Sequence, residues 1–257
     1  KNAIQYAHDN IRRFAEAQRD SITEFETELR PGLYTGQRLL PVSCAGCYVP
    51  GGRYAHIASA LMTITTARAA GVPHVIACAP PRGSSGIAPE VLYTMQLAGA
   101  DTILTMGGVQ ACAAMAFGLF DTPPADILVG PGNAFVAEAK RQLFGPVGID
   151  MVAGPTDSLI LADSSADPYL VALDLAGQAE HGLTSPVWLV TNDTALARSV
   201  GDRMPAACAE IGGDNGETAM RAWEAMGEII LCENREEMAQ EADRIAPEHL
   251  HVQCRDL

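Results

Sequence analysis

The stretch "SLILADSSADPYLVALDLAGQAEHGLTSPVWLVTND" (residues 158–193) contains one complete strand–helix–strand unit. Its first six and last seven residues are apolar runs typical of short buried strands, and the middle carries apolar residues at helical spacing. Asp167 before Pro168 is a typical helix start, because the carboxylate accepts from first-turn amides and proline fits the first turn. Since a crossover helix joins parallel strands, this stretch predicts a parallel α/β sheet.

The same alternation extends over most of the chain. Further apolar runs of strand length lie at residues 74–81, 102–108, 126–132 and 228–233. Stretches with apolar residues at helical spacing lie at residues 54–71, 89–99, 109–119, 133–145 and 235–246. The first 40 residues indicate an amphipathic helix with a charged face, followed by an extended segment. We therefore predict an α/β fold with two Rossmann-like parallel-sheet domains. One would span residues 48–156, and the other would combine residues 1–47 with 157–257.

Composition limits the functions that this chain can have. Its 257 residues are 48% hydrophobic and 19% charged, and the net charge is −14. A nucleic-acid partner is not expected, because binding one needs clustered Lys and Arg, whereas a single Arg suffices for a small anionic substrate. No apolar run reaches membrane-spanning length, and the seven cysteines are scattered. We expect a cytoplasmic protein with no membrane partner, and Cys44 and Cys47 as structural thiols.

Three glycine-rich segments each end a predicted strand and open a helix, namely residues 47–56, 106–114 and 129–140. Glycine lets backbone amides approach a ligand closely, and a helix N-terminus favours an anion such as a phosphate. None of the three is a G-x-G-x-x-G fingerprint, and each alone is equally explained as a tight turn. Together, with Tyr48, Gln110 and Asn133 beside them, they favour one shared nucleotide site at the carboxyl ends of the strands.

Two further clusters carry candidate chemistry. Gln178 and His181 are three residues apart at a helix end, so their side chains share one face, although His181 is equally explained by the helix dipole. An imidazole suits zinc well, whereas a Gln oxygen is a less usual ligand. Glu248 and His249 enter a short apolar strand and supply the groups needed for acid–base chemistry. Adjacent strand residues face opposite ways, so a shared role requires a bend there. His251 lies within that strand and is the more structural candidate.

Six motifs together resemble one known family. The motifs "GCYVPGG" (46–52), "GGVQA" (107–111), "GPGNAFVAEAKRQLFG" (130–145), "GIDMVAGPTDSL" (148–159), "QAEHG" (178–182) and "APEHL" (246–250) occur in the order and spacing of the histidinol dehydrogenase family. The similarity extends from about Ile4 to Leu257. It implies a zinc-dependent homodimer that oxidises a primary alcohol through an aldehyde to a carboxylate with two NAD molecules.

The resemblance also implies roles for individual residues. Gln178 and His181 match zinc ligands that also contact substrate, and Glu248 and His249 match the acid–base pair. In that chemistry His249 takes the proton of the alcohol and also contacts the substrate, and Glu248 activates the water that adds to the aldehyde. Three further positions, Tyr48, Gln110 and Asn133, match NAD contacts, and Thr156 matches a substrate contact.

Two departures from histidinol dehydrogenases concern the substrate. The chain has Arg53-Tyr54-Ala55-His56 where that family carries small or apolar residues, and Thr156-Asp157-Ser158 where it usually has Ser-Glu-Val. Both stretches resemble a sister group, the sulfopropanediol 3-dehydrogenases, which oxidise 2,3-dihydroxypropane-1-sulfonate to sulfolactate in sulfonate breakdown. A sulfonate needs hydrogen-bond donors, and Arg53 and His56 are candidates for them. Arg53 is equally compatible with the cofactor pyrophosphate or with a surface position.

The resemblance further implies that the chain is truncated at both ends. An Asp and a partner-subunit His would complete the zinc site beyond Leu257, so the chain as written supplies half of it. Two alternatives stay open: a histidinol dehydrogenase of histidine biosynthesis, and a non-catalytic nucleotide-binding module that has kept the fold.

Overall fold

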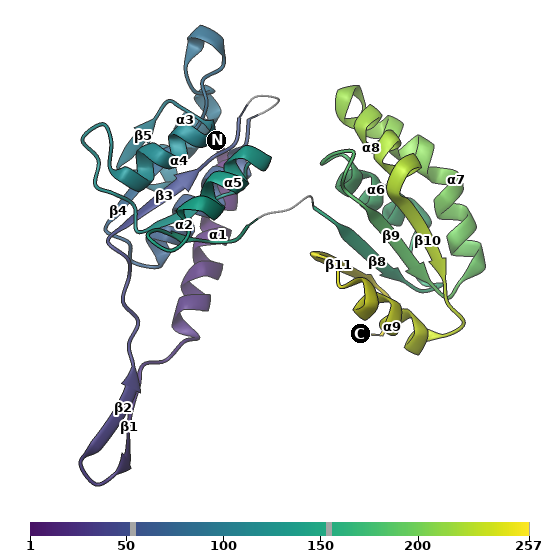
Figure 1. Cartoon of the computed structure of the whole chain (residues 1–257). Coiled ribbons are helices and arrows are strands. Elements are labelled where there is room, and N and C mark those ends of the chain that lie inside the picture. Colours follow the sequence, from purple (N-terminus) through teal and green to yellow (C-terminus); the bar gives the residue numbers. More distant parts are fainter. Residues whose placement is uncertain (52–54, 153–155, 257) are drawn as a thin grey trace. The chain divides into compact units, whose positions relative to one another are not determined.

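The computed structural model describes residues 1–51, 55–152 and 156–256. The chain divides into two compact units, Lys1–Gly154 and Pro155–Leu257, and each has its own sheet and hydrophobic core (Figure 1). The predicted α/β fold with parallel sheets is confirmed. None of the helices in the described ranges is long and apolar enough to cross a membrane.

The first unit is built on a five-stranded parallel sheet of order β5-β4-β3-β6-β7. Its strands are β3 (Cys44–Tyr48), β4 (His74–Cys78), β5 (Thr102–Leu104), β6 (Ile127–Val129) and β7 (Gly148–Ile149). In order of appearance this is 3-2-1-4-5, the order of a Rossmann-like half. The strands β4 and β5 lie on one side of β3, and β6 and β7 lie on the other. The connections after β3 and after β6 therefore run in opposite directions from the carboxyl edge of the sheet.

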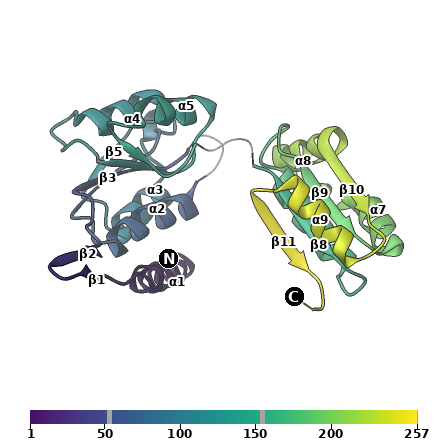
Figure 2. The same cartoon turned by 60° about the horizontal axis from the view of Figure 1, so that its bottom comes forward.

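Helices cover both faces of this sheet (Figure 2). The helices α2 (Ile57–Ala69) and α3 (Pro89–Ala98) pack on one face, and α4 (Gly108–Phe117) and α5 (Ala134–Leu143) on the other. Cys44 and Cys47 lie on opposite faces of β3, because side chains three residues apart on a strand point to opposite sides. Both are buried free thiols. This agrees with the structural role expected of them.

The segment before the sheet comprises a helix and a hairpin. The helix α1 (Asn2–Asp20) packs on α2 through Ile4, Ala7 and Ile11, which join the core of the first unit. The strands β1 (Phe25–Arg30) and β2 (Leu33–Gln37) form an antiparallel hairpin that extends away from the sheet, with every residue exposed (Figure 1). Gly32 has φ +81° in the turn, a conformation that glycine adopts at little cost.

The second unit has a four-stranded parallel sheet of order β10-β9-β8-β11. Its strands are β8 (Ser158–Ala162), β9 (Val187–Thr191), β10 (Gly227–Leu231) and β11 (His249–Gln253). One face packs against α6 (Pro168–Ala179), α7 (Thr194–Ile211) and α8 (Gly213–Met226), and the other against α9 (Arg235–Ile245), as Figures 1 and 2 show. The order is again 3-2-1-4, with β8 as the first strand.

The structure differs from the sequence analysis in two respects. Residues 1–47 lie with residues 48–154, because α1 packs on α2 and β3 is the central strand of the first sheet; the discontinuous domain of 1–47 with 157–257 is not the division seen. Residues 194–226, where the sequence pattern predicts no element, form α7 and α8. Pro205 inside α7 and the glycines around the start of α8 obscure the helical pattern.

Candidate functional site

The described parts of the three glycine-rich segments meet at the carboxyl edge of the first sheet. Tyr48 ends β3, and its hydroxyl accepts a hydrogen bond from the backbone N–H of Gly108 at 2.9 Å, where α4 begins. Gly130, after β6, has φ +113°, and a Cβ there would come within 2.1 Å of the carbonyl oxygen of Tyr48. The loop after β6 therefore packs directly against the end of β3, and only glycine fits this approach.

Tyr48 is an internal part of this edge. Its side chain is buried, with 5% of the residue exposed, and burial raises the pKa of its phenol. Because the hydroxyl already binds Gly108, Tyr48 fixes the glycine loops relative to each other.

Gln110 and Asn133, in contrast, are exposed at the same edge. Asn133 caps α5, since its side-chain oxygen accepts from the backbone amides of Phe135 and Val136 at 3.1 Å each. A ligand would therefore meet the amide nitrogen of Asn133. The side-chain oxygen of Gln110 lies over Gly108, where an added Cβ would come within 2.9 Å of it.

A buried ion pair holds the loop after β6 and was missed from the sequence. Lys140 on α5 is 2% exposed, pairs with Asp150, and donates to the carbonyl oxygen of Gly130 at 3.0 Å. Asp150 in turn accepts from the backbone N–H of Gly130 at 2.7 Å. Both backbone groups of Gly130 are thus fixed by one ion pair. The sequence feature that could have indicated a buried Lys140 is its helical spacing from Val136 and Leu143, which places it on the apolar face of the helix.

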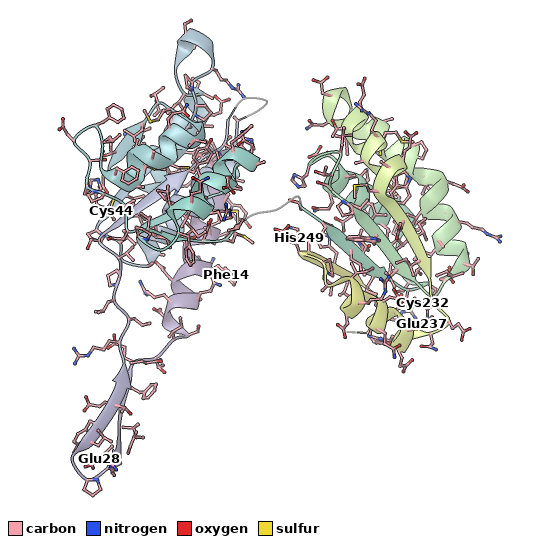
Figure 3. The ribbon with its side chains drawn as sticks, in the orientation of Figure 1. Phe14, Glu28, Cys44, Cys232, Glu237 and His249 are labelled. Carbon is pink, nitrogen blue, oxygen red and sulfur yellow. The ribbon has the colours of Figure 1, made fainter. Side chains whose placement is uncertain are left out.

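The candidate acid–base pair lies at the amino edge of the second sheet. Figure 3 shows His249 at one end of this sheet and Cys232 and Glu237 at the other. His249 is the first residue of β11, and its Nε2 lies 3.7 Å from Oε1 of Glu248. Both side chains are partly exposed. The bend that a shared role requires is therefore present, because adjacent residues in a regular strand would point apart.

Gln178 and His181 lie at the same edge of this unit, where α6 ends. Gln178 is in the last turn of α6, and its Oε1 accepts a hydrogen bond from the hydroxyl of Ser158 at 3.1 Å. His181 is exposed, and its backbone N–H donates to the carbonyl oxygen of Gln178 at 3.3 Å. Thr156 is half-buried and lies two residues before β8. The structure thus collects five predicted residues at the amino edge, whereas the sequence analysis expected ligands at carboxyl edges.

A second histidine on β11 joins this strand to α6. His251 Nδ1 and Asp174 Oδ2 are 2.7 Å apart, and the side-chain amide of Gln253 donates to the same oxygen at 3.0 Å. Asp174 precedes Gln178 by one helical turn, so it holds the edge strand against the helix that carries Gln178. His251 therefore has the structural role expected of it.

The proposed sulfonate donors are described in part. His56 is half-buried immediately before α2, and its burial lowers the pKa of the imidazole. Arg53 lies outside the described residues.

The donors at the end of α6 fit zinc by type. An imidazole and a side-chain carbonyl oxygen are nitrogen and oxygen ligands, but a tetrahedral site needs about four in total. Within the described part of the chain, no group of three or more His, Cys, Asp or Glu side chains is placed to hold a metal. By type, Gln178 and His181 could supply at most two of these ligands.

Fold and site together define the class of protein: an α/β protein with two Rossmann-like parallel sheets, glycine loops at the carboxyl edge of one and a Glu–His pair at the amino edge of the other. The model of the histidinol dehydrogenase family matches residues 1–257. The chain belongs to the histidinol dehydrogenase family.

Individual relatives agree with this assignment. The chain is 66% identical to a histidinol dehydrogenase homolog and 60% identical to a sulfopropanediol 3-dehydrogenase, both from Ruegeria pomeroyi; each match covers the whole chain and 59% of the relative. The crystal structure of histidinol dehydrogenase from Elizabethkingia anophelis matches 99% of the chain and 58% of its own, with a TM-score of 0.92 and 33% identity. The chain thus spans about three-fifths of the length of these relatives.

Proposed function

We propose that this protein is an NAD- and zinc-dependent dehydrogenase that oxidises a primary alcohol to a carboxylate in two successive steps. The favoured substrate is 2,3-dihydroxypropane-1-sulfonate, with 3-sulfolactate as product. The observation that carries the proposal is the Glu248–His249 pair, with 3.7 Å between Oε1 and Nε2, at the sheet edge that also holds Gln178 and His181.

His249 is the base in the first step. An exposed imidazole at the start of a strand accepts the hydroxyl proton of an alcohol when its ring nitrogen is neutral. In the second step Glu248 takes a proton from the water that adds to the bound aldehyde. With 3.7 Å between Oε1 of Glu248 and Nε2 of His249, both groups can act on the same bound molecule in succession.

Gln178 and His181 would hold the zinc, together with the Asp and the partner-subunit His that the family resemblance implies. A bound zinc ion lowers the pKa of a coordinated hydroxyl, which eases removal of its proton. Gln110 and Asn133 would contact NAD at the carboxyl edge of the first sheet, where Tyr48 and the Lys140–Asp150 pair fix the loops that approach it. As the resemblance to the histidinol dehydrogenase family implies, the active enzyme would be a homodimer with a shared site.

One observation favours a sulfonate over histidinol among the relatives whose names state an activity; the 66% identical relative is named a histidinol dehydrogenase homolog. The chain is 60% identical to a relative named sulfopropanediol 3-dehydrogenase, and 41% identical to a histidinol dehydrogenase from Lactiplantibacillus plantarum. Thr156, Arg53 and His56 would contact the substrate, the last two as donors to the permanent anion. If Arg53→Ala leaves the KM for both the sulfonate and NAD unchanged, Arg53 has no such role.

The test is NADH formation by the zinc-loaded full-length protein, with dihydroxypropanesulfonate and histidinol offered in parallel. We expect two NADH per sulfonate and none from histidinol. Turnover of histidinol alone would assign the protein to histidine biosynthesis, and no turnover of either would leave the dehydrogenase scaffold with a different, unidentified substrate.

A further inference from the structure

Asp157 is the residue through which the start of β8 holds the start of β11. Its carboxylate oxygen Oδ1 accepts a hydrogen bond from the backbone N–H of Glu248 at 2.6 Å, and its carbonyl oxygen accepts from the backbone N–H of His249 at 3.2 Å. Both members of the candidate acid–base pair are thus held by their backbones on one residue, 91 positions away from Glu248.

The strand ladder alone does not place Glu248. The parallel pairing of β8 with β11 begins at Ser158 and His249, so Glu248 lies outside it. Ala246, two residues earlier, has φ +49°, a left-handed conformation that is uncommon for a residue with a Cβ. The chain therefore arrives from α9 in an unfavourable turn, and the Asp157 carboxylate extends the ladder by one bond to Glu248.

That bond accounts for the bend that brings the pair together. In a regular strand the side chain of Glu248 would point away from that of His249. With its amide fixed on Asp157, its Oε1 lies 3.7 Å from His249 Nε2 instead.

We propose that Asp157 is a positioning residue for the Glu248–His249 pair, an inference that rests on the proposed function. Asp157 orients the pair without touching the substrate. Loss of its carboxylate leaves the Glu248 amide unpaired, and the pair then samples geometries in which it does not transfer a proton.

The opposite end of the same strand pair offers a matched control. Asp163, just after β8, accepts from the backbone N–H of Arg255, just after β11, at 3.1 Å. Asp157 and Asp163 thus hold the two ends of β11 on β8 through the same type of bond, but only Asp157 holds the acid–base pair. A purely structural role would make the two aspartates equivalent.

The experiment compares Asp157→Ala, Asp157→Asn and Asp163→Ala in the full-length protein. We expect Asp157→Ala to lower kcat by about tenfold or more with the KM for NAD within about twofold of wild type, because only the transition state loses the oriented pair. Asp157→Asn keeps an acceptor oxygen and should restore most of kcat. Asp163→Ala should leave kcat within about twofold of wild type.

Hydrogen exchange of the backbone amides of Glu248, His249 and Leu250 tests the positioning without any assay of activity. We expect faster exchange in Asp157→Ala, and rates close to wild type in Asp157→Asn and Asp163→Ala. Unchanged exchange in Asp157→Ala, or an equal loss of kcat in Asp163→Ala, would overturn the inference. A wild-type protein that forms no NADH from any alcohol, with the expected exchange pattern, would instead reject the proposed function and keep the positioning.

Discussion

Lys140 buries a charged amine inside the first unit. Burial of a charge costs free energy unless the group is paired and hydrogen-bonded, as Lys140 is with Asp150 and Gly130. Lys140→Met keeps the apolar stem but leaves Asp150 without its cation. We expect a loss of roughly 2 kcal/mol in the free energy of unfolding, less than for a fully buried pair because Asp150 is partly exposed. We also expect a higher KM for NAD, because the loop at Gly130 loses the hydrogen bond from Lys140 to its carbonyl oxygen.

Arg141→Met is the matched control for this prediction. Arg141 is the next residue on α5 and pairs with Glu138 on the exposed surface. Urea denaturation should show little change for Arg141→Met, since exposed pairs contribute little. Equal free energies of unfolding for the two variants would contradict a stabilising role of the Lys140–Asp150 pair.

The buried thiols of β3 make the first unit sensitive to alkaline pH. Burial raises the pKa of Cys44 from 9.0 to about 11 and that of Cys47 from 9.0 to about 12. Above pH 9 the unfolded chain loses these protons while the folded chain keeps them, so stability is full below pH 9 and falls as pH rises towards the folded pKa values. The slope is at most about 1.4 kcal/mol per pH unit for each thiol.

We therefore expect the free energy of unfolding to fall between pH 9 and pH 10, and to fall less steeply in the Cys44→Ala/Cys47→Ala variant. Urea denaturation at half-unit steps of pH measures this. Identical slopes for the variant and wild type would show that other groups dominate.

At the residue scale, local signals predicted more than distant ones. The helix caps Asn133 and Asp167 follow from adjacent residues, and both cap as expected. Gln178 and His181 were recognised by their spacing and by resemblance. Asp157 was not assigned a partner, because its bond to Glu248 joins positions 91 apart and no local pattern encodes that contact.

At the scale of elements, two glycines of the second unit lead to opposite expectations. A Cβ at Gly177 on α6 would meet nothing within 4 Å, whereas one at Gly216 on α8 would lie 2.4 Å from the carbonyl oxygen of Cys208 on α7. Gly177→Ala should stabilise by about 0.5–1 kcal/mol through the entropy of the unfolded chain. Gly216→Ala should destabilise by about 1–3 kcal/mol, because α7 and α8 must separate.

Thermal melting of the two alanine variants beside wild type checks this pair. A Gly216→Ala protein as stable as wild type would mean that the two helices do not approach as closely as described.

Most strands and helices could be predicted, because apolar periodicity reports burial directly. The strand runs at 158–163 and 187–193 correspond to β8 and β9, and the helix between them to α6. The helices α7 and α8 were not foreseen, since proline and glycine within them weaken the local signal although tertiary packing sustains them. The exposed hairpin of β1 and β2 was expected only as an extended segment.

At the scale of the whole molecule, two sheets of the same Rossmann-like strand order carry their candidate residues at opposite edges. In the first unit the segments after β5 and β6 present Gln110 and Asn133 at the carboxyl edge, as the general rule for α/β sheets predicts. In the second unit the Glu–His pair lies before β11, at the amino edge. The rule therefore located the glycine loops of the first unit, whereas the Glu–His pair of the second unit was identified by resemblance.

The central claim is that Glu248 and His249 divide two successive oxidations between them. The most direct measurement is the number of NADH formed per molecule of dihydroxypropanesulfonate by full-length wild type and Glu248→Gln. We expect two for wild type and one for Glu248→Gln, because the amide leaves His249 as a base but no longer activates water for the second step. Two NADH from Glu248→Gln at the wild-type rate would contradict this account.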